Sequence, residues 1–469
     1  MIRFSRNPRL AGSLRGKLLK NLVDSGRYEL SRRHKYQTNE VRDMIKQTVL
    51  RYKLEKTNDL ITSHAGLALL GEFAVGLGFL DALDRELPSP GSGAGYRSSE
   101  HVFPLVLMLN GGGRSLEDLR QIREDRGLRE VLEMRRIPSS DASGDWMRRG
   151  GGRGVLEGLS AVNRRVLKRG LKHDGVDGYT LDIDATGIEA EKELARMTYK
   201  GYTGYMPIVG HLAENGLVIG DEFREGNEAP ASRNLEFIKH CEVQLPGGKH
   251  IKAFRADSAS YQAEIINYCH GKGILFAIGG DLDEAVVRQI DSLGEDDWGG
   301  YQDGFIADTV HCMNKTDQAF RLVAIRRPVQ GKLFDESDRK ERYKVIATNR
   351  TESAEEVVRW YNQRGESSEN RIKDLKIGFG MERMPCGQFK ANAVFFRIGA
   401  LAYNVGRLFV LKALDGSWHR HQVQTLRWKL YETAGKVVFH GGAVWLKVRR
   451  NVQGLFEKIR MRTWRFAFG

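Results

Sequence analysis

The sequence predicts an α/β protein in which an all-helical N-terminal domain precedes a mixed sheet covered by helices. Apolar residues recur at the 3.6-residue spacing of helices from about residue 54 to 170, and near residue 178 the period changes to the alternation of strands. Two apolar runs then flank Asn215-Gly216, which is the strongest short signal for a β-hairpin. Alternating helix and strand patterns follow to residue 280, which favours a mixed sheet.

Residues with capping and breaking character divide the helical region. Ser99 opens an apolar helix that ends at the glycines 111–113, and Ser115 with Asp118 forms a capping-box pattern for the next helix. Ser139 is the first of three candidate N-caps for the helix that contains Trp146. The arginines of this region are compatible with a DNA-reading helix or with a solvated face.

The second half of the chain contains the expected strands and their covering helices. Strands are predicted over 179–186, 205–212, 217–223, 251–257 and 274–280, with helices over 234–243 and 260–270. Residues 296–350 interrupt this alternation with β-like runs over 320–327 and 343–349, which indicates a β insertion. A capping box at Ser353 and Glu356 then starts a helix, and 391–414 is a long apolar helix expected in the core.

Charge is distributed unevenly along the chain. The net charge is +14, yet residues 1–60 and residues 416–469 each carry a net of +9, which leaves about −4 for the centre. Basic ends and an acidic centre suit a protein whose flanks bind a polyanion while central carboxylates hold metal ions. Solvated basic arms are the alternative explanation.

Several classes of protein are disfavoured. The longest unbroken apolar run, Val102–Leu109, is far shorter than the ~20 residues of a membrane span, so a cytoplasmic protein without a membrane contact is expected. The four Cys form no Cys-x-x-Cys pair and are expected to be reduced thiols. No His is followed three residues later by Arg, as tyrosine recombinases require, and no phosphate-binding Gly-x₄-Gly-Lys-Ser/Thr or Gly-x-Ser-x-Gly motif occurs.

Two carboxylates at strand ends are the best indication of chemistry. Asp is a poor strand former, yet Asp182 and Asp184 share one face of the strand 179–186, and Asp257 ends the strand 251–257. If these strands are neighbours, Asp184 and Asp257 meet at one edge of the sheet. A third acid from a later helix would complete an oxygen-rich site for Mg²⁺, as two-metal phosphodiester cleavage requires. Each Asp alone is more often a turn or cap residue.

These residues belong to motifs that resemble a known family. The chain is similar to bacterial DDE transposases of the cut-and-paste, insertion-sequence-four superfamily, and most closely to its thirteen-eighty group. The resemblance runs from about Leu54 to Lys447 through LNGGGRSLEDLR, LDIDAT, EKELARMTYKGYTGYMPIVGHLAENG, RADSASYQAEIINYC and WYNQRGESSENRIKDLK. The first 50 residues fall outside it.

The resemblance implies a fold, cofactors and a set of site residues. It implies an RNase H-like core with a β insertion before its last acidic helix, and two Mg²⁺ ions, for which Mn²⁺ can substitute. Asp184, Asp257 and Glu369 are implied as the catalytic metal ligands. The superfamily signature Tyr-x₂-Arg-x₃-Glu-x₆-Lys corresponds to Tyr361, Arg364, Glu369 and Lys376.

One departure from the signature concerns the third ligand. Four residues separate Arg364 from Glu369, where the signature has three, which puts the two side chains ~140° out of phase on a regular helix. Either one helix ends and another begins near Gly365, or a π-bulge restores the phase. Glu369 is favoured because the downstream spacing fits it, and Glu366 is the competing candidate.

The signature also implies DNA contacts. Tyr361, Arg364, Lys373 and Lys376 are implied to bind the DNA near the cut, although a solvated helix face explains Lys373 equally well. Trp298, in the insertion, is either a packing residue or a platform for a flipped base. The expected partners are double-stranded DNA, as transposon ends and target, and a second copy of the chain in a synaptic homodimer.

The resulting domain division follows the patterns above. We expect a basic extension over 1–50, a helical DNA-binding domain over 51–175, the first part of the core over 176–295, the β insertion over 296–350, the acidic helix and following core helix over 351–415, and a basic region over 416–469. The predicted function is a DNA transposase, a bacterial endonuclease and strand-transfer enzyme of an insertion sequence that acts at the nucleoid. The alternatives are a catalytically impaired DNA-binding relative and a simple two-metal nuclease.

Overall fold

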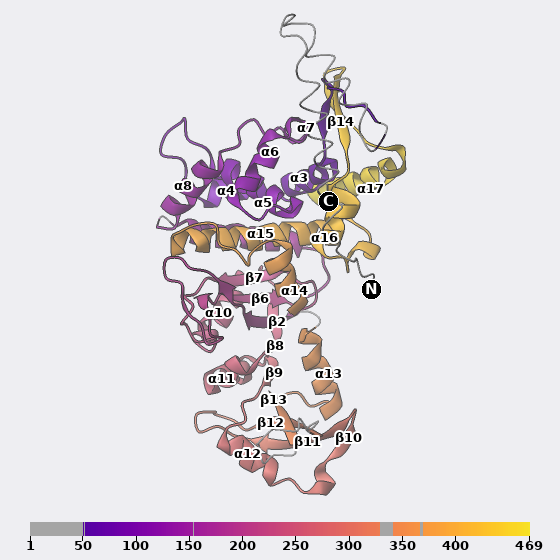
Figure 1. The fold of residues 1–469 in the computed structure, drawn as a ribbon. Helices are drawn as coiled ribbons and strands as arrows, with labels where there is room; N and C mark the ends of the chain where they lie inside the picture. Colours follow the sequence, from indigo (N-terminus) through magenta and orange to yellow (C-terminus); the bar gives the residue numbers. More distant parts are fainter. Residues whose placement is uncertain (1–49, 51, 153, 329–340, 366–368) are drawn as a thin grey trace, which may run out of the picture. The chain divides into compact units, whose positions relative to one another are not determined.

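The computed structural model describes residues 50, 52–152, 154–328, 341–365 and 369–469. The chain divides into two parts, Met1–Asn58 and Asp59–Gly469. The predicted extension 1–50 therefore lies almost entirely outside the described residues, as does most of the charged loop that joins the predicted insertion strands. The fold described below is that of Asp59–Gly469 (Figure 1).

The first segment of this part is mainly helical. Its helices are α3 (Ala65–Gly76), α4 (Phe79–Glu86), α5 (Ser98–Gly111), η3 (Leu116–Asp118), α6 (Leu119–Glu124), α7 (Arg126–Val131), α8 (Ser140–Gly150) and α9 (Val155–Gly170). The predicted caps are confirmed: the Ser139 side chain accepts a hydrogen bond from the Ala142 amide, and Ser115 and Asp118 form a capping box. Gly112 ends α5 with a φ of +108°, a conformation that favours glycine.

One prediction for this segment is wrong in detail. The short strand β1 (Leu60–Thr62) lies where the pattern indicated helix. It pairs antiparallel with β14 (Gly435–His440), which in turn pairs with β15 (Ala443–Lys447). A local pattern does not report a strand of three residues whose partner lies more than 370 positions later in the chain.

A mixed sheet of nine strands is formed by the described residues. In spatial order the strands are β10 (Gly299–Tyr301), β11 (Gly304–His311), β12 (Phe320–Pro328), β13 (Glu341–Thr348), β9 (Leu275–Gly279), β8 (His250–Ala256), β2 (Gly178–Ala185), β6 (Ile208–Leu212) and β7 (Val218–Glu222). The pairs β2–β8 and β8–β9 are parallel and the other pairs are antiparallel. The predicted hairpin between β6 and β7 turns at Gly216, whose φ is +76°.

The predicted insertion strands extend this sheet. β12 and β13 correspond to the runs at 320–327 and 343–349, and β13 pairs with β9 through Ala277, Ile278 and Gly279. The strands β10 and β11 were not singled out in the sequence. Helices α10 (Asn234–Gln244), α11 (Ala263–Lys272) and α12 (Glu284–Asp291) lie among the sheet strands in the chain, and the first two confirm the predicted helices.

Helix α15 (Phe389–Ala413) connects the helical segment with the sheet. Figure 1 shows it between the N-terminal helices and strands β6 and β7. Asn404 on this helix accepts a hydrogen bond from the Val218 amide at 2.8 Å and donates to the Val218 carbonyl at 2.7 Å. Arg397 binds the Asp221 carboxylate with its Nε at 3.1 Å. These buried polar contacts fix one edge of the sheet to the helix.

Among the described residues, α15 is also the single helix that by itself has the length and apolar composition of a membrane span. Its apolar window is 83% buried inside the protein, as expected of a core helix. The helices α3 and α4 reach the same criterion only when taken together, and they are bent by 57°.

Candidate active site

The carboxyl ends of β2 and β8 bring Asp184 and Asp257 to the same edge of the sheet. The two strands are neighbours and run parallel, with Asp182 level with Arg255. Continuing this register by two residues places Asp184 level with Asp257. Asp257 directly follows β8, where its carboxylate accepts a hydrogen bond from the Ala259 amide at 3.2 Å. The arrangement on which the sequence prediction depended is therefore present.

Asp182, two residues before Asp184, has a different environment. It is fully buried, and its carboxylate accepts two hydrogen bonds of 2.8 Å from Nε and Nη2 of Arg255. The remaining Nη1 of Arg255 donates to the carbonyl of Trp360 at 2.7 Å, and the guanidinium lies 5.0 Å from the centre of the Trp360 ring. This bidentate pair connects two strands to the helix α13 (Ala354–Arg364).

Helix α13 places Tyr361 and Arg364 beside the two carboxylates. The helix begins at the predicted capping box, in which Ser353 accepts a hydrogen bond from the Glu356 amide. Arg364, at the other end, is buried and has its Nη2 3.3 Å from the Asp184 carboxylate and 3.2 Å from the Ile183 carbonyl. The Nε of Arg364 is buried and has no hydrogen-bond partner among the described residues. Tyr361 is also buried.

Electrostatic coupling joins Glu369 to this group. The pKa of Asp184 is raised to about 6, mainly by burial; the positive charge of Arg364 lowers it, and the negative charges of Asp257 and Glu369 add to the rise. Burial disfavours the charge of Arg364, but Asp184 and Asp257 outweigh this effect and its pKa is raised. The negative charges of Asp257 and Glu369 therefore both raise the pKa of Asp184, and Arg364 supplies the nearest positive charge.

The backbone around Glu369 is π-helical. Gly365 and Glu369 both have this conformation, on either side of residues 366–368, which lie outside the described residues together with the competing candidate Glu366. A π-helical turn adds one residue to a helix, and it is one of the two ways in which the spacing between Arg364 and Glu369 could be accommodated. The exposed Glu369 then leads into α14 (Asn370–Lys373) and a second π-helical segment, η7 (Asp374–Gly378).

The signature lysine Lys376 and the other predicted DNA-binding lysine, Lys373, differ in their environments. Lys376 donates a hydrogen bond to the Gly187 carbonyl at 2.7 Å, just beyond the end of β2. Burial lowers the pKa of Lys376, as does the charge of Lys200, while Glu382 and Asp184 oppose the shift. Lys373 is exposed, and no ion pair joins it to an acid among the described side chains.

Two further lysines near the acids were not singled out in the sequence. Lys200 lies in the turn between the short strands β4 (Arg196–Met197) and β5 (Thr203–Tyr205), and its charge lowers the pKa of Asp184. Lys344 on β13 lies 5.0 Å from the centre of the Tyr361 ring, and burial lowers its pKa, a shift that the negative charge of Glu369 opposes. The position of Lys344 depends on how the insertion joins β9, which no local pattern predicts.

The donor set suits a hard cation. Asp184, Asp257 and Glu369 offer only carboxylate oxygens, which Mg²⁺ and Mn²⁺ prefer over nitrogen or sulfur ligands. No three His, Cys, Asp or Glu side chains in the described ranges stand close enough together to hold one metal ion. In the conformation seen, Arg364 is the cationic partner of Asp184.

Trp298 has the packing role that was the alternative to base stacking. It is 9% exposed, and the Arg326 guanidinium covers its ring at 4.5 Å from the centre. The Tyr343 ring lies beside it, with the two ring centres 6.1 Å apart. Both neighbours come from the insertion strands β12 and β13, so the indole supports the insertion from within.

A family model of known proteins matches this chain. The family described as "Transposase DDE domain group 1" matches residues 46–460, which is most of the chain. No curated protein is similar enough to count as a relative.

Proposed function

Because the chain belongs to the DDE transposase domain family, we propose that it is a cut-and-paste DNA transposase that cleaves DNA at terminal inverted repeats and transfers the freed strand ends to target DNA. The main support is the convergence of Asp184 and Asp257 at the ends of two adjacent parallel strands, with Glu369 acting on Asp184. Within this family, we propose that the chain belongs to the thirteen-eighty group of the insertion-sequence-four superfamily, to which its motifs are similar.

The proposed core is RNase H-like. Three antiparallel strands, β7, β6 and β2, are followed in the sheet by the parallel strands β8 and β9. The insertion β10–β13 precedes α13 in the chain. This order supports a core in which two acids end neighbouring central strands and the third comes from a later helix.

Asp184, Asp257 and Glu369 are the residues that would hold two divalent ions. When bound there, Mg²⁺ or Mn²⁺ would activate an oxygen that attacks a phosphodiester and would stabilise the oxygen that leaves it. The environment of Asp184 fits this role, because a nearby cation would stabilise the charge of a partly buried carboxylate that two other acids disfavour. Arg364 would then be released to bind a phosphate, and its Nε without a partner is a donor available to that ligand.

The remaining site residues are proposed to orient DNA. The exposed Lys373 and Lys376, which donates a hydrogen bond to the Gly187 carbonyl, both follow Glu369 in the chain. They would contact phosphates beside the cut. Tyr361 would hold Arg364 and the strand end in place. The helical segment before the sheet is proposed to bind the transposon ends, in a homodimer that brings two ends together at the bacterial nucleoid.

A cleavage and joining assay tests this function. The substrate is a linear DNA with the inverted repeats that flank the gene, incubated with the protein in Mg²⁺, in Mn²⁺ or in chelator, with a supercoiled plasmid as target. We expect cuts at the repeat ends only with metal, followed by joined products. Cleavage without joining would instead identify a two-metal nuclease. Binding of the repeats without cleavage in either metal would identify an impaired relative.

A further inference from the structure

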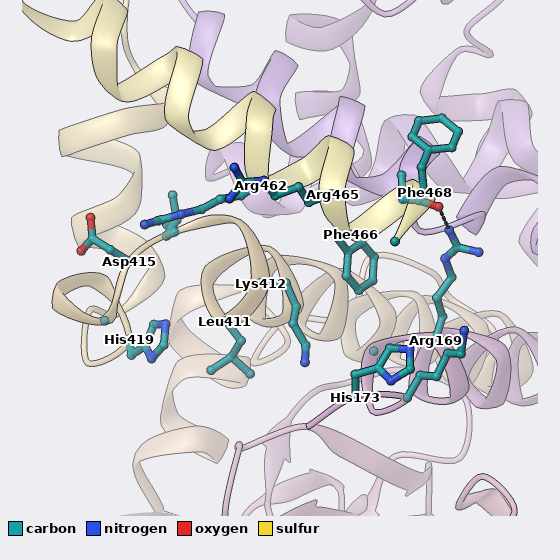
Figure 2. Close-up of a pocket in the computed structure, with 16 residues that line it drawn as sticks. Arg169, His173, Leu411, Lys412, Asp415, His419, Arg462, Arg465, Phe466 and Phe468 are labelled. Carbon is teal, nitrogen blue, oxygen red and sulfur yellow. Dashed lines mark hydrogen bonds between the residues drawn. The ribbon is translucent and has the colours of Figure 1, made fainter. Parts of the chain in front are cut away.

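A cavity of about 790 Å³ lies away from the predicted acids, between the ends of three helices (Figure 2). It is bounded by the last turn of α9 and the residues after it, by the last turn of α15 with the loop that follows, and by α17 (Arg450–Phe468). It shares no lining residue with the group around Asp184 and Asp257. None of the proposed metal ligands or signature residues accounts for this cavity.

The lining of the cavity is strongly basic. Figure 2 shows side chains that come from all three elements. The basic residues are Arg169, Lys172, His173, Lys412, His419, Arg462 and Arg465. Asp415 is the single acidic side chain of the lining, and its carboxylate already accepts hydrogen bonds from the amide and hydroxyl of Ser417. The lining therefore holds five lysines and arginines against Asp415 and the terminal carboxylate of Gly469, which leaves an excess of positive charge.

Most of these lysines and arginines form no ion pair among the described residues, although the charge of Arg462 lowers the pKa of Asp415. Arg169 donates to the Ala467 carbonyl at 2.6 Å, which fixes its direction but leaves its charge uncompensated. Lys172, Lys412, Arg462 and Arg465 take part in none of the ion pairs that the described residues form. The pKa of Lys412 is lowered, mainly by burial. The negative charge of Asp174 opposes this shift, and the positive charge of Lys249 adds to it. Arg169, Lys172 and Arg465 are exposed, and Lys412 and Arg462 are half-buried, so these cations from three elements are accessible to an anionic ligand.

The geometry points to phosphate groups of DNA as that ligand: we infer that this cavity binds the phosphodiester backbone of a DNA segment away from the cleavage site. The inference rests on the proposed function only for the choice of DNA as the polyanion. A single phosphate would fill a small part of about 790 Å³, whereas cations on three elements can contact successive phosphates. The exposed Phe468 and the half-buried Phe466 add apolar surface beside the cations, as in sites that bind nucleic acid strands.

The salt dependence of DNA binding tests the inference. The double variant Lys412→Gln/Arg462→Gln removes two cavity charges, and Lys168→Gln/Lys458→Gln removes two exposed charges from α9 and α17 outside the cavity. Binding to a labelled duplex is measured in chelator, so that cleavage plays no part. We expect the cavity variant to reduce the slope of log K against log salt by about 2 and the affinity at 0.1 M salt by roughly 50-fold. The control variant should change affinity less than about threefold.

Other outcomes would overturn the inference. Equal loss in both double variants would mean that general charge, and not the cavity, binds DNA. Stoichiometric binding of pyrophosphate or ATP that the cavity variant loses, with DNA binding unchanged, would assign the cavity to small phosphates. If the first variant does not fold, as judged by circular dichroism, Lys172→Gln/Arg465→Gln removes two other lining charges and carries the same expectation. Because no arm measures cleavage, failure of the proposed enzymatic function leaves this test intact.

Discussion

Two aspartates on one strand face show how far a residue's role depends on tertiary partners. Asp182 and Asp184 are indistinguishable by strand periodicity, and only the position of Asp184 at the strand end and the family motif distinguish them in the sequence. In the structure, Asp182 is saturated by the bidentate contact with Arg255, while Asp184 lies near two other acids and a single arginine. The first has the surroundings of a structural carboxylate and the second those of a functional one.

Stability measurements should separate these two aspartates. Asp182→Asn leaves the buried Arg255 without its counter-charge, so we expect the free energy of unfolding to fall by about 3–5 kcal/mol. Asp184→Asn removes a charge that burial already disfavours, so the free energy of unfolding should change by less than about 1 kcal/mol. Urea unfolding at pH 7 compares the two variants. Equal destabilisation would contradict the division of roles.

At the scale of elements, the contact of α10 with the sheet depends on glycine. Gly210 on β6 and Gly220 on β7 are directly paired, and both face the buried Cys241 of α10. A Cβ atom at either glycine would lie 2.8 Å from the Cys241 sulfur, which is too close. The two glycines therefore set the distance at which this helix covers the strands next to β2.

A double-mutant cycle tests this packing. Gly210→Ala should lower the free energy of unfolding by about 1–3 kcal/mol, because the new methyl group must displace Cys241. Cys241→Ala makes room for that methyl group, so the double variant should lose about 1 kcal/mol less than the sum of the single variants. Strict additivity of the two free-energy changes would mean that the sulfur is not what excludes a side chain at position 210.

Elements with local signals were predictable, and those that depend on distant pairing were not. The capping boxes at Ser115 and Ser353 and the hairpin at Gly216 each lie within a few residues of the element they define. The π-helical backbone at Gly365 and Glu369 is one of two solutions that the signature spacing allowed. By contrast, β1 and the β14–β15 hairpin were missed, because β1 pairs with a strand at the opposite end of the part described.

For the molecule as a whole, the sequence predicted where basic residues are concentrated, but it did not predict which of them come together in the folded chain. The excess of basic residues over 416–469 was evident from counting. The arginines of α17 line one cavity together with Arg169 and Lys412. This arrangement depends on how three helices pack, which counting charges does not show. The same applies to the predicted site: its acids could be named, whereas the nearby Lys200 and Lys344 could be found only from the folded chain.

The most direct test of the account is metal-dependent cleavage by variants of the three acids. Asp184→Asn, Asp257→Asn and Glu369→Gln are compared with Glu382→Gln, a nearby acid outside the proposed metal site that pairs with Arg114 at 3.7 Å. Each variant is assayed for binding of the inverted-repeat DNA in chelator and for its cleavage in Mg²⁺. We predict that each of the three loses more than about 100-fold in cleavage and keeps its binding, while Glu382→Gln cleaves normally. Cleavage at the normal rate by any of the three would contradict the proposed active site.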